Sequence, residues 1–119
     1  MKYIANGCKN KQLRNDISFA RIHYLKGRTV AAERLEDRAF WVAYHNEENL
    51  RLVAIAVKEE HKGKGYGRFM LGRVIKYARE QGFVKIRTRT KDAVDFYQKF
   101  GNAKIIGAAD EDYLMEMEI

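Results

Sequence analysis

The sequence predicts one α/β or α+β domain in which helices cover the faces of a mixed sheet. The first observation is length, because 119 residues suffice for one compact domain and are too few for two. The second is the order of patterns along the chain: a hairpin, a buried strand, a helix, a strand, a helix and a final hairpin. The third is that nine glycines, with no proline, separate these segments. Residues 1–119 are therefore expected to form a single domain with one site.

The segment before the hairpin predicts a short strand at 2–5 and a helix at about 13–25. The apolar residues of this helix recur on one face: Leu13, Ile17, Ala20, Tyr24 and Leu25. Gly27 is its expected C-cap. Residues 29–37 fit either a short helix or a strand, and both remain open.

The segments 39–44 and 50–57 predict a β-hairpin, because both are rich in β-branched and aromatic residues. The polar stretch 45–49 forms the turn between them. The second strand is nearly all apolar after Arg51, which is typical of a strand buried on both faces at the centre of a sheet.

The clearest helix is predicted at 66–81, where apolar residues form one stripe and charged residues lie away from it. The stripe comprises Met70, Leu71, Val74, Ile75 and Ala78. Gly82 ends this helix, and a short strand is expected at 83–88.

The remaining segments predict a second helix at 92–100, with Gly101 as its cap, and a closing antiparallel pair at 103–106 and 112–119. The second helix is expected to turn four side chains inward: Ala93, Phe96, Tyr97 and Phe100.

Composition excludes several classes of protein. Hydrophobic residues make up 46% and charged residues 33%, which is a globular balance rather than a disordered or coiled-coil one. No apolar run approaches the roughly 20 residues that cross a bilayer, so we expect a cytoplasmic protein with no membrane partner. One cysteine and three histidines do not form a usual metal site, so we expect no metal. The net charge of +7 favours anionic ligands.

Three alternating glycines follow the buried strand, in the turn from Lys62 to Gly67. Because glycine lacks a Cβ atom, Gly63, Gly65 and Gly67 can adopt unusual φ values and aim successive N–H groups into one concavity. The next helix points the positive end of its dipole at the same place. A diphosphate fits this arrangement, with countercharge from the neighbouring cations Lys62, Lys64 and Arg68. The alternative is a tight turn without a ligand.

Two other phosphate-binding patterns are absent from this turn. The Rossmann fingerprint needs a different glycine spacing and an acidic residue about 20 residues further on, and the Walker loop needs Gly-Lys-Ser or Gly-Lys-Thr. A nucleotide-binding domain is therefore the weaker interpretation.

The segment from Val57 to Arg68 resembles motif A of the GCN5-related N-acetyltransferase (GNAT) superfamily. Lys62 stands where the family has Arg or Gln, Gly65 and Gly67 stand at its two small positions, and Leu71 is the apolar residue of the helix. The resemblance implies a mostly antiparallel mixed sheet with helices on both faces, and a turn that holds the pyrophosphate of acetyl-coenzyme A.

The same resemblance implies that the backbone near Ile55 to Val57 hydrogen-bonds the pantetheine arm of the cofactor. The residues expected to contact acetyl-CoA are Ile55, Val57, Lys62, Gly63, Lys64, Gly65, Tyr66, Gly67 and Arg68.

A second segment, Ala93 to Gly101, resembles motif B of the same family. The resemblance implies that Tyr97 lies near the thioester sulfur and is the catalytic residue that donates a proton to the departing thiolate. A phenol of ordinary pKa near 10 is protonated at neutral pH and can do so. The alternative is that Phe96 and Tyr97 are only core aromatics.

The chain departs from the family pattern at four positions. Lys62 keeps the charge of arginine but loses its bidentate grip. Glu59 stands where proline is common, Thr90 where asparagine is common, and Asn102 where an aromatic residue is typical. None of these changes removes a backbone amide from the turn, so they bear on affinity more than on identity.

No general base is assigned by the sequence. Glu59 and Glu60 lie close to the turn but are expected to face solvent, and His23 and His45 are candidates because they fall in segments that border the acceptor groove in this family. The region before the hairpin is short for the family, which predicts an open groove. Such a groove suits a lysine or α-amine on a protein as the acceptor, or an encounter with nucleic acid. The sequence is compatible with a monomer and with a homodimer.

Two functions follow. The leading one is an acetyl-CoA-dependent N-acetyltransferase that transfers the acetyl group directly to an amine, since Cys8 lies far in sequence from both motifs. The alternative is a catalytically degenerate member of the same fold that binds CoA, or nucleic acid through its basic surface.

Overall fold

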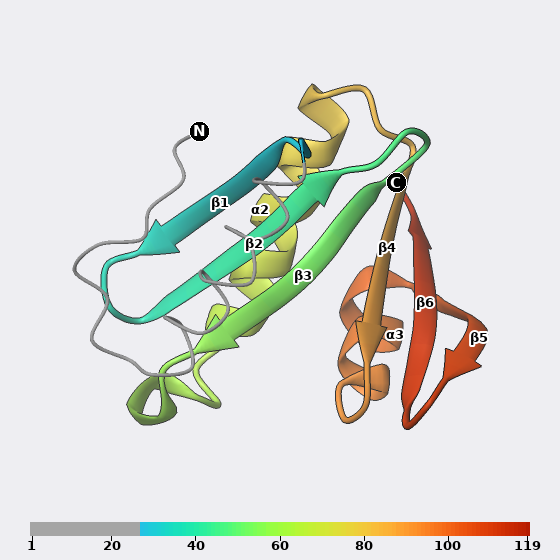
Figure 1. Cartoon of the computed structure of the whole chain (residues 1–119). Coiled ribbons are helices and arrows are strands. Elements are labelled where there is room, and N and C mark those ends of the chain that lie inside the picture. Colours follow the sequence, from blue (N-terminus) through green and yellow to red (C-terminus); the bar gives the residue numbers. More distant parts are fainter. Residues whose placement is uncertain (1–26) are drawn as a thin grey trace.

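The computed structural model describes residues 27–119, which form a six-stranded sheet and two α-helices (Figure 1). The strands are β1 (Val30–Leu35), β2 (Ala39–His45), β3 (Leu50–Val57), β4 (Lys85–Thr90), β5 (Lys104–Ala109) and β6 (Asp112–Glu118). The helices are α2 (Tyr66–Glu80) and α3 (Val94–Gly101), with a single 3₁₀ turn, η1 (Glu59–His61), before α2. No helix within these residues is long and apolar enough to cross a bilayer.

The sheet has the order β1-β2-β3-β4-β6-β5, and every neighbouring pair is antiparallel except β3 and β4. The parallel pair is short, because only Leu50–Leu52 of β3 is in register with 86–88 of β4. Beyond this point the two strands separate toward their C-terminal ends (Figure 1). The predicted fold class, a mixed and mostly antiparallel sheet with helices, is confirmed.

Most predicted elements appear with shifted ends. The segment 29–37, for which a helix and a strand were both predicted, contains the strand β1. This strand pairs with β2 along its whole length. The hairpin and the helix at 66–81 are confirmed, and the strand predicted at 83–88 begins and ends two residues later. The strand expected at 2–5 and the helix expected at 13–25 lie outside the described residues.

Strand β3 is central in the sheet but is not buried along its length. Leu50 and Leu52 are buried, whereas residues 53–57 are only half-buried. The reason is the departure of β4, which leaves the second half of β3 with one strand neighbour, β2. A bulge at Val53 adds to the bend at this point, since Val42 pairs with Ala54 and the next residue pairs with Leu52.

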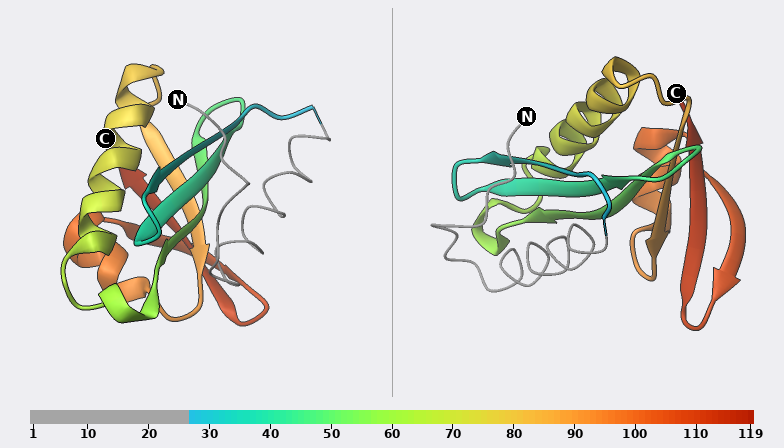
Figure 2. Two further views of the ribbon diagram at one scale, coloured as in Figure 1. Left: turned by 90° about the vertical axis from the view of Figure 1, so that its left-hand side faces the viewer. Right: turned by 45° about the horizontal axis from the view of Figure 1, so that its top comes forward.

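The main core lies between the sheet and both described helices, which share one face of the sheet (Figure 2). Its largest fully buried side chains come from every layer: Trp41, Leu50, Met70, Leu71, Ile86, Met115 and Met117. The opposite face carries a smaller buried cluster around Phe40 and Val42. Glu33 ties β1 to α2, because its carboxylate accepts hydrogen bonds from Trp41 Nε1 and Arg73 Nε, each at 3.0 Å.

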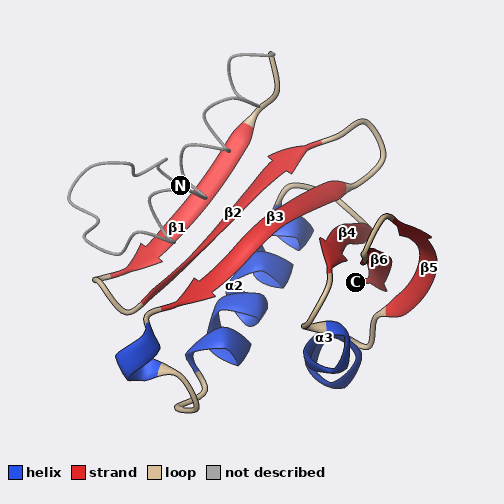
Figure 3. Ribbon diagram, turned by 60° about the horizontal axis from the view of Figure 1, so that its bottom comes forward, coloured by secondary structure: helices blue, strands red, loops and turns tan. Residues whose placement is uncertain are grey.

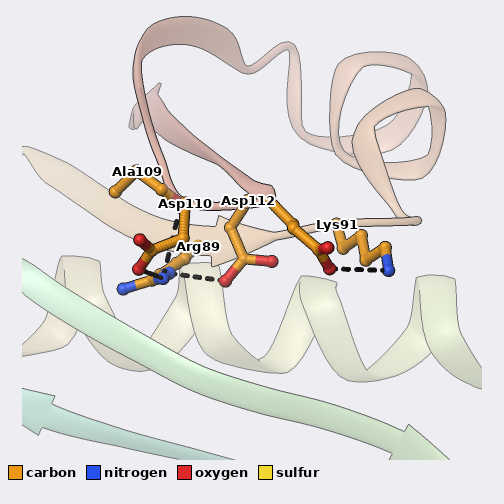
Figure 4. Close-up of polar contacts among 6 residues, drawn as sticks. Arg89, Lys91, Ala109, Asp110 and Asp112 are labelled. Carbon is orange, nitrogen blue, oxygen red and sulfur yellow. Dashed lines mark hydrogen bonds and ion pairs between the residues drawn. The ribbon is translucent and has the colours of Figure 1, made fainter.

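The last hairpin is fastened to β4 by ion pairs near the turn between β5 and β6 (Figure 4). Arg89 Nε donates to Asp112 Oδ2 at 2.5 Å, and another nitrogen of its guanidinium lies 3.3 Å from Asp110 Oδ2. Lys91 Nζ lies 3.0 Å from Glu111 Oε2. The tip between β5 and β6 is therefore held against the end of β4.

Helix α3 ends differently from the prediction. Gly101 is the last helical residue and not the cap; Asn102, with φ 51°, takes the left-handed C-cap position instead. A Cβ atom at Gly101 would lie 3.2 Å from Met117 Cγ and 3.4 Å from Leu71 Cδ2. Gly101 thus allows α3 to pack closely against the core. Phe100, expected to face inward, is 37% exposed.

Far from the glycine turn, His45 pairs with Leu50, at the end of β2 where β3 begins. His45 Nε2 lies 2.6 Å from Tyr77 Oη, and the imidazole packs edge-on against Phe83. Burial lowers the pKa of His45 and raises the pKa of Tyr77, so at neutral pH the phenol donates to a neutral imidazole.

We expect Gly101→Ala to destabilise the protein by about 1–3 kcal/mol, because the added methyl group must displace the packed side chain of Met117. Gly72→Ala is the matched control, since it is also helical but its Cβ would meet nothing within 4 Å. It should stabilise by about 0.5–1 kcal/mol through helix propensity. Urea unfolding of both variants measures the two signs, and a neutral or stabilising Gly101→Ala would contradict this account of α3.

Acidification should weaken the fold through His45. Because the folded state lowers its pKa, the unfolded chain binds the proton more readily, and stability is lost as the pH falls from about 6.5 through the folded value. The lowered pKa values of Glu33 and Glu116 act only below 4.5, their ordinary value. Urea midpoints at about pH 7.5 and 5 should therefore fall more in the wild type than in His45→Gln, which keeps an acceptor but does not titrate. Equal falls would show that His45 is not the titrating group.

Candidate active site

The separation of β3 and β4 opens a cleft of about 640 Å³ between β3, the turn after η1, and α3. Figure 3 shows the elements that form its walls. The cleft is lined by Ile55, Val57, His61, Lys62, Gly63, Gly65, Tyr66, Gly67, Arg68, Asp92, Ala93, Phe96, Tyr97 and Phe100.

Sequence reasoning placed ten residues in the site, and nine of them line this cleft. They come from three segments that are distant in the chain: Ile55 and Val57, the turn with the start of α2, and Tyr97. Lys64 does not line the cleft, although its neighbours on both sides do. The position of Lys64 between two glycines in the sequence therefore did not predict where its side chain lies.

Five residues that line the cleft were not expected there. Four of them, Asp92, Ala93, Phe96 and Phe100, belong to α3 or to the turn before it, and the fifth is His61. The two phenylalanines had been assigned to the core from their helical spacing. The polar turn between β4 and α3 could have indicated that this segment lines the cleft. It has the same strand-turn-helix pattern as the glycine turn.

The unpaired half of β3 presents backbone groups to the cleft. Lys58 N–H donates to Arg38 O at 2.8 Å, which directs the backbone of Lys58 toward β2. Successive residues of a strand aim their N–H and C=O groups in opposite directions. The backbone groups of Val57 and Ile55 therefore point away from β2, into the space that β4 has left.

The glycine turn uses its three glycines in two ways. Gly63 and Gly65 have φ of 78° and 86°, which are left-handed values that other residues adopt only with strain. Gly67 has no such value; a Cβ atom there would lie 3.3 Å from Phe96 Cε1. Its role is to let α3 approach α2, which corrects the expectation that all three glycines shape the turn.

Backbone amides of the turn are free to bind a ligand. Gly65 is the N-cap of α2, and no side chain caps this helix end. Among the backbone hydrogen bonds outside regular elements in residues 27–119, none is donated by an amide of 63–68. The first amides of a helix lack intrahelical partners and carry the positive end of the dipole. The turn therefore offers backbone donors to an anion in the cleft that it lines.

Two cationic side chains accompany these amides in the cleft. Lys62 Nζ lies 2.9 Å from Glu59 Oε2, and both side chains are mostly exposed, so this pair contributes little and can open. The guanidinium of Arg68 lies over the ring of Phe100, 5.2 Å from its centroid. This stacking keeps the charge of Arg68 at the edge of the cleft.

Tyr97, from α3, is one of the residues that line the cleft. It is 6% exposed. Burial raises the pKa of Tyr97, so the phenol keeps its proton at neutral pH. The group can donate a proton within the cleft but cannot serve as a base there.

Of the candidate bases within residues 27–119, none lines the cleft. Glu59 and Glu60 form η1 and are exposed, as expected. His45 is at the opposite end of β3, is engaged by Tyr77 and does not line this cleft. His23 lies outside the described residues. Asp92 is the sole carboxylate among the described residues that line the cleft.

The sequence and the fold were compared with known proteins. Residues 15–101 match the sequence model of the acetyltransferase (GNAT) family. A search of curated proteins gave no match.

Solved acetyltransferases share the fold. An acetyltransferase from Bacillus cereus ATCC 14579 superposes with a TM-score of 0.70 at 18% identity, covering 100% of this chain and 99% of that one. The PaiA N-acetyltransferase of Thermoplasma acidophilum, solved with coenzyme A, gives 0.70 at 18% identity over 92% of this chain and 70% of that one. A GNAT acetyltransferase of Elizabethkingia anophelis with acetyl-CoA bound gives 0.66 at 20% identity, over 92% and 84%.

These identities are low, so the solved structures establish a shared fold, while the family match spans both the glycine turn and the segment of Tyr97. The chain belongs to the acetyltransferase (GNAT) family.

Proposed function

We propose that this protein is an acetyl-CoA-dependent N-acetyltransferase that transfers the acetyl group directly to an amine. The observation that carries the proposal is that one cleft joins the free amides of the glycine turn, the unpaired edge of β3 and the hydroxyl of Tyr97. Related structures solved with coenzyme A or acetyl-CoA support the identity of the donor.

The glycine turn would bind the pyrophosphate of the cofactor. Its amides and the dipole of α2 offer several donors to phosphate oxygens at once. Lys62 can exchange its exposed carboxylate partner for a phosphate, and Arg68 is held at the edge of the cleft by Phe100. No metal ion is needed for this countercharge, because both cations line the cleft.

The pantetheine arm would run along β3. Its two amides alternate donors and acceptors much as a peptide does, and an extended chain can add to an open strand edge through main-chain hydrogen bonds. The backbone groups of Ile55 and Val57 that point away from β2 are the partners available for it. This placement would bring the thioester toward the point where β3 and β4 meet, beside Tyr97.

Direct transfer then needs two proton movements. A neutral amine attacks the thioester carbonyl, the C–N bond forms, the C–S bond breaks, and the amine proton leaves to a base or water. The departing thiolate takes the phenolic proton of Tyr97. A thiol has a pKa of about 8.5 and a phenol one near 10, so the phenol is an acid weaker than the thiol it would form. The transfer therefore depends on what stabilises the phenolate.

A catalytically degenerate, CoA-binding member of the fold is the second candidate. It is favoured by the scarcity of bases in the described part of the cleft, where Asp92 is the one carboxylate. The two functions differ in whether an acceptor is needed. The transferase requires an amine, either on a protein or peptide or on a smaller molecule, whereas the degenerate module requires none.

Calorimetry tests the donor site. We expect acetyl-CoA and CoA to bind and ATP not to respond, and Arg68→Ala to weaken CoA binding about tenfold because it removes a charged contact in the cleft. Lys64→Ala is the matched control, since it removes the same charge two residues from Lys62 but outside the cleft, and it should change the affinity less than about twofold. Equal losses in the two variants would mean that general attraction, and not a contact, binds the cofactor.

Thiol release on mixing acetyl-CoA with a panel of amines tests the chemistry. We expect Tyr97→Phe to lower kcat about 100-fold, because it removes the general acid, while the affinity for CoA stays nearly unchanged. An affinity that collapses with kcat would make Tyr97 structural, and the absence of thiol release with every amine would favour the degenerate module.

A further inference from the structure

Strand β5 stands at one end of the sheet, and within the described residues β6 is its only strand neighbour (Figure 1). Edge strands present unpaired N–H and C=O groups, which proteins often protect with charged side chains or proline. Strand β5, of sequence Lys-Ile-Ile-Gly-Ala-Ala, carries one charge, on Lys104 at its first position, and no proline. Neither device therefore protects the rest of this edge from pairing with a further strand.

Large apolar side chains are exposed on the same hairpin. Ile105 and Ile106 are each 47% exposed, and Tyr113 of β6 is 44% exposed. Ile105 is opposite Met115, and Tyr113 lies two residues before Met115 on β6, so Ile105 and Tyr113 share one face of the sheet. Ala108, opposite Tyr113, shares that face as well. The edge thus combines open backbone groups with apolar side chains that nothing in the described chain covers.

The backbone of β5 aims two residues outward. The hairpin closes through a two-residue turn, 110–111, and the pair that flanks such a turn is hydrogen-bonded. Bonded and non-bonded pairs then alternate along β6, so Tyr113 and Met115 belong to non-bonded pairs. Their partners on β5 are Ala108 and Ile105. The N–H and C=O groups of these two residues point away from β6, to the open edge.

The side chains of β5 complement those of an antiparallel copy of the same strand. The first three residues are bulky, and the last three are Gly-Ala-Ala. A two-fold axis between Ile106 and Gly107 sets each bulky residue opposite a small one. It also sets Ile105 opposite Ala108, and these two share a face because a bulge lies between them. This register therefore joins the two residues whose backbone groups point outward.

Charges at the two ends of β5 match under the same two-fold axis. Lys104 begins the strand, and Asp110 follows its last residue with a mostly exposed side chain. Antiparallel pairing brings Lys104 of each copy near Asp110 of the other, and the contact occurs twice. A parallel copy would instead place the two Lys104 ammonium groups side by side, which is unfavourable. Size and charge thus select the same partner in the same direction.

We propose that a second copy of this chain is the partner of this edge: the two β5 strands pair antiparallel, and the sheet continues from one protomer into the other. Ile105 of one protomer then lies against Ala108 of its partner and reaches the exposed ring of Tyr113 beside it. A single pair of short strands is small beside the roughly 1,200–2,000 Å² that stable interfaces bury, so the dimer forms reversibly.

Sedimentation equilibrium of the full chain tests the dimer. We expect the wild type to pass from monomer to dimer over about 5–500 μM, and Ile105→Lys to raise the dissociation constant at least about tenfold by placing a charge in the apolar contact. Val84→Lys is the matched control, because it adds the same charge at an exposed apolar side chain outside the hairpin, and it should leave dimerisation unchanged. A wild type that stays monomeric throughout, or equal weakening by both variants, would overturn the proposal.

Exchanging the end charges tests the direction of pairing. Lys104→Glu should weaken the dimer about fivefold because it brings two carboxylates together, and adding Asp110→Lys should restore most of the loss. Weakening without rescue would refute the antiparallel register. Because no residue of β5 or β6 lines the cleft, Ile105→Lys should bind CoA as the wild type does in calorimetry. A failure of the proposed acetyl transfer would therefore leave the sedimentation result as a separate test of the dimer.

Discussion

The short pairing between β3 and β4 is the constraint on which the rest of the structure depends. Three residues of each strand are in register, after which β3 keeps β2 as its neighbour and β4 keeps β6. The inner edge of β3 is left with backbone donors and acceptors that no described strand satisfies. Unpaired backbone groups are costly if they are also kept from water. The opening must therefore hold either water or a ligand whose polar groups resemble those of a peptide.

Close contacts at two glycines set the shape of this opening. Gly67 lets Phe96 of α3 approach the start of α2, and Gly101 lets the end of α3 approach Met117 of β6. Helix α3 is thereby fixed at both ends, and Tyr97 lies between the two contacts. The position of the phenol relative to the glycine turn is therefore determined by packing.

Much of this fold could be predicted from local patterns, because the hairpin at β2 and β3, helix α2 and the last hairpin have strong periodicity. The strand β1 could not, since its mixture of small apolar and charged residues fits a helix equally, and only pairing with β2 decides it. The end of α3 was misplaced by one residue because glycine usually caps helices, whereas Gly101 is used here for close packing and Asn102 takes the left-handed conformation.

The site was predictable where backbone chemistry defines it and less so where tertiary structure does. The glycine turn and Tyr97 were found from their motifs, but Phe96, Phe100 and Asp92 face the cleft only because β4 leaves β3, an event that no local pattern reveals. For the same reason no local pattern reveals that His45 lies at the far end of β3, against Tyr77.

The six strands form one continuous sheet, but they fall into two groups along the chain. Strands β1 to β3 occupy 30–57 and strands β4 to β6 occupy 85–118, so nearly every strand pairing is made between neighbours in the chain. Arg89 and Lys91 add ion pairs within the second group. The pairing between the groups, from Leu50 with Ile86 to Leu52 with Thr88, is the shortest in the sheet and joins residues far apart in the chain, so it adds a loop-closure cost in folding. The cleft is lined by residues from both sides of this pairing, so it forms only where the two groups of strands meet.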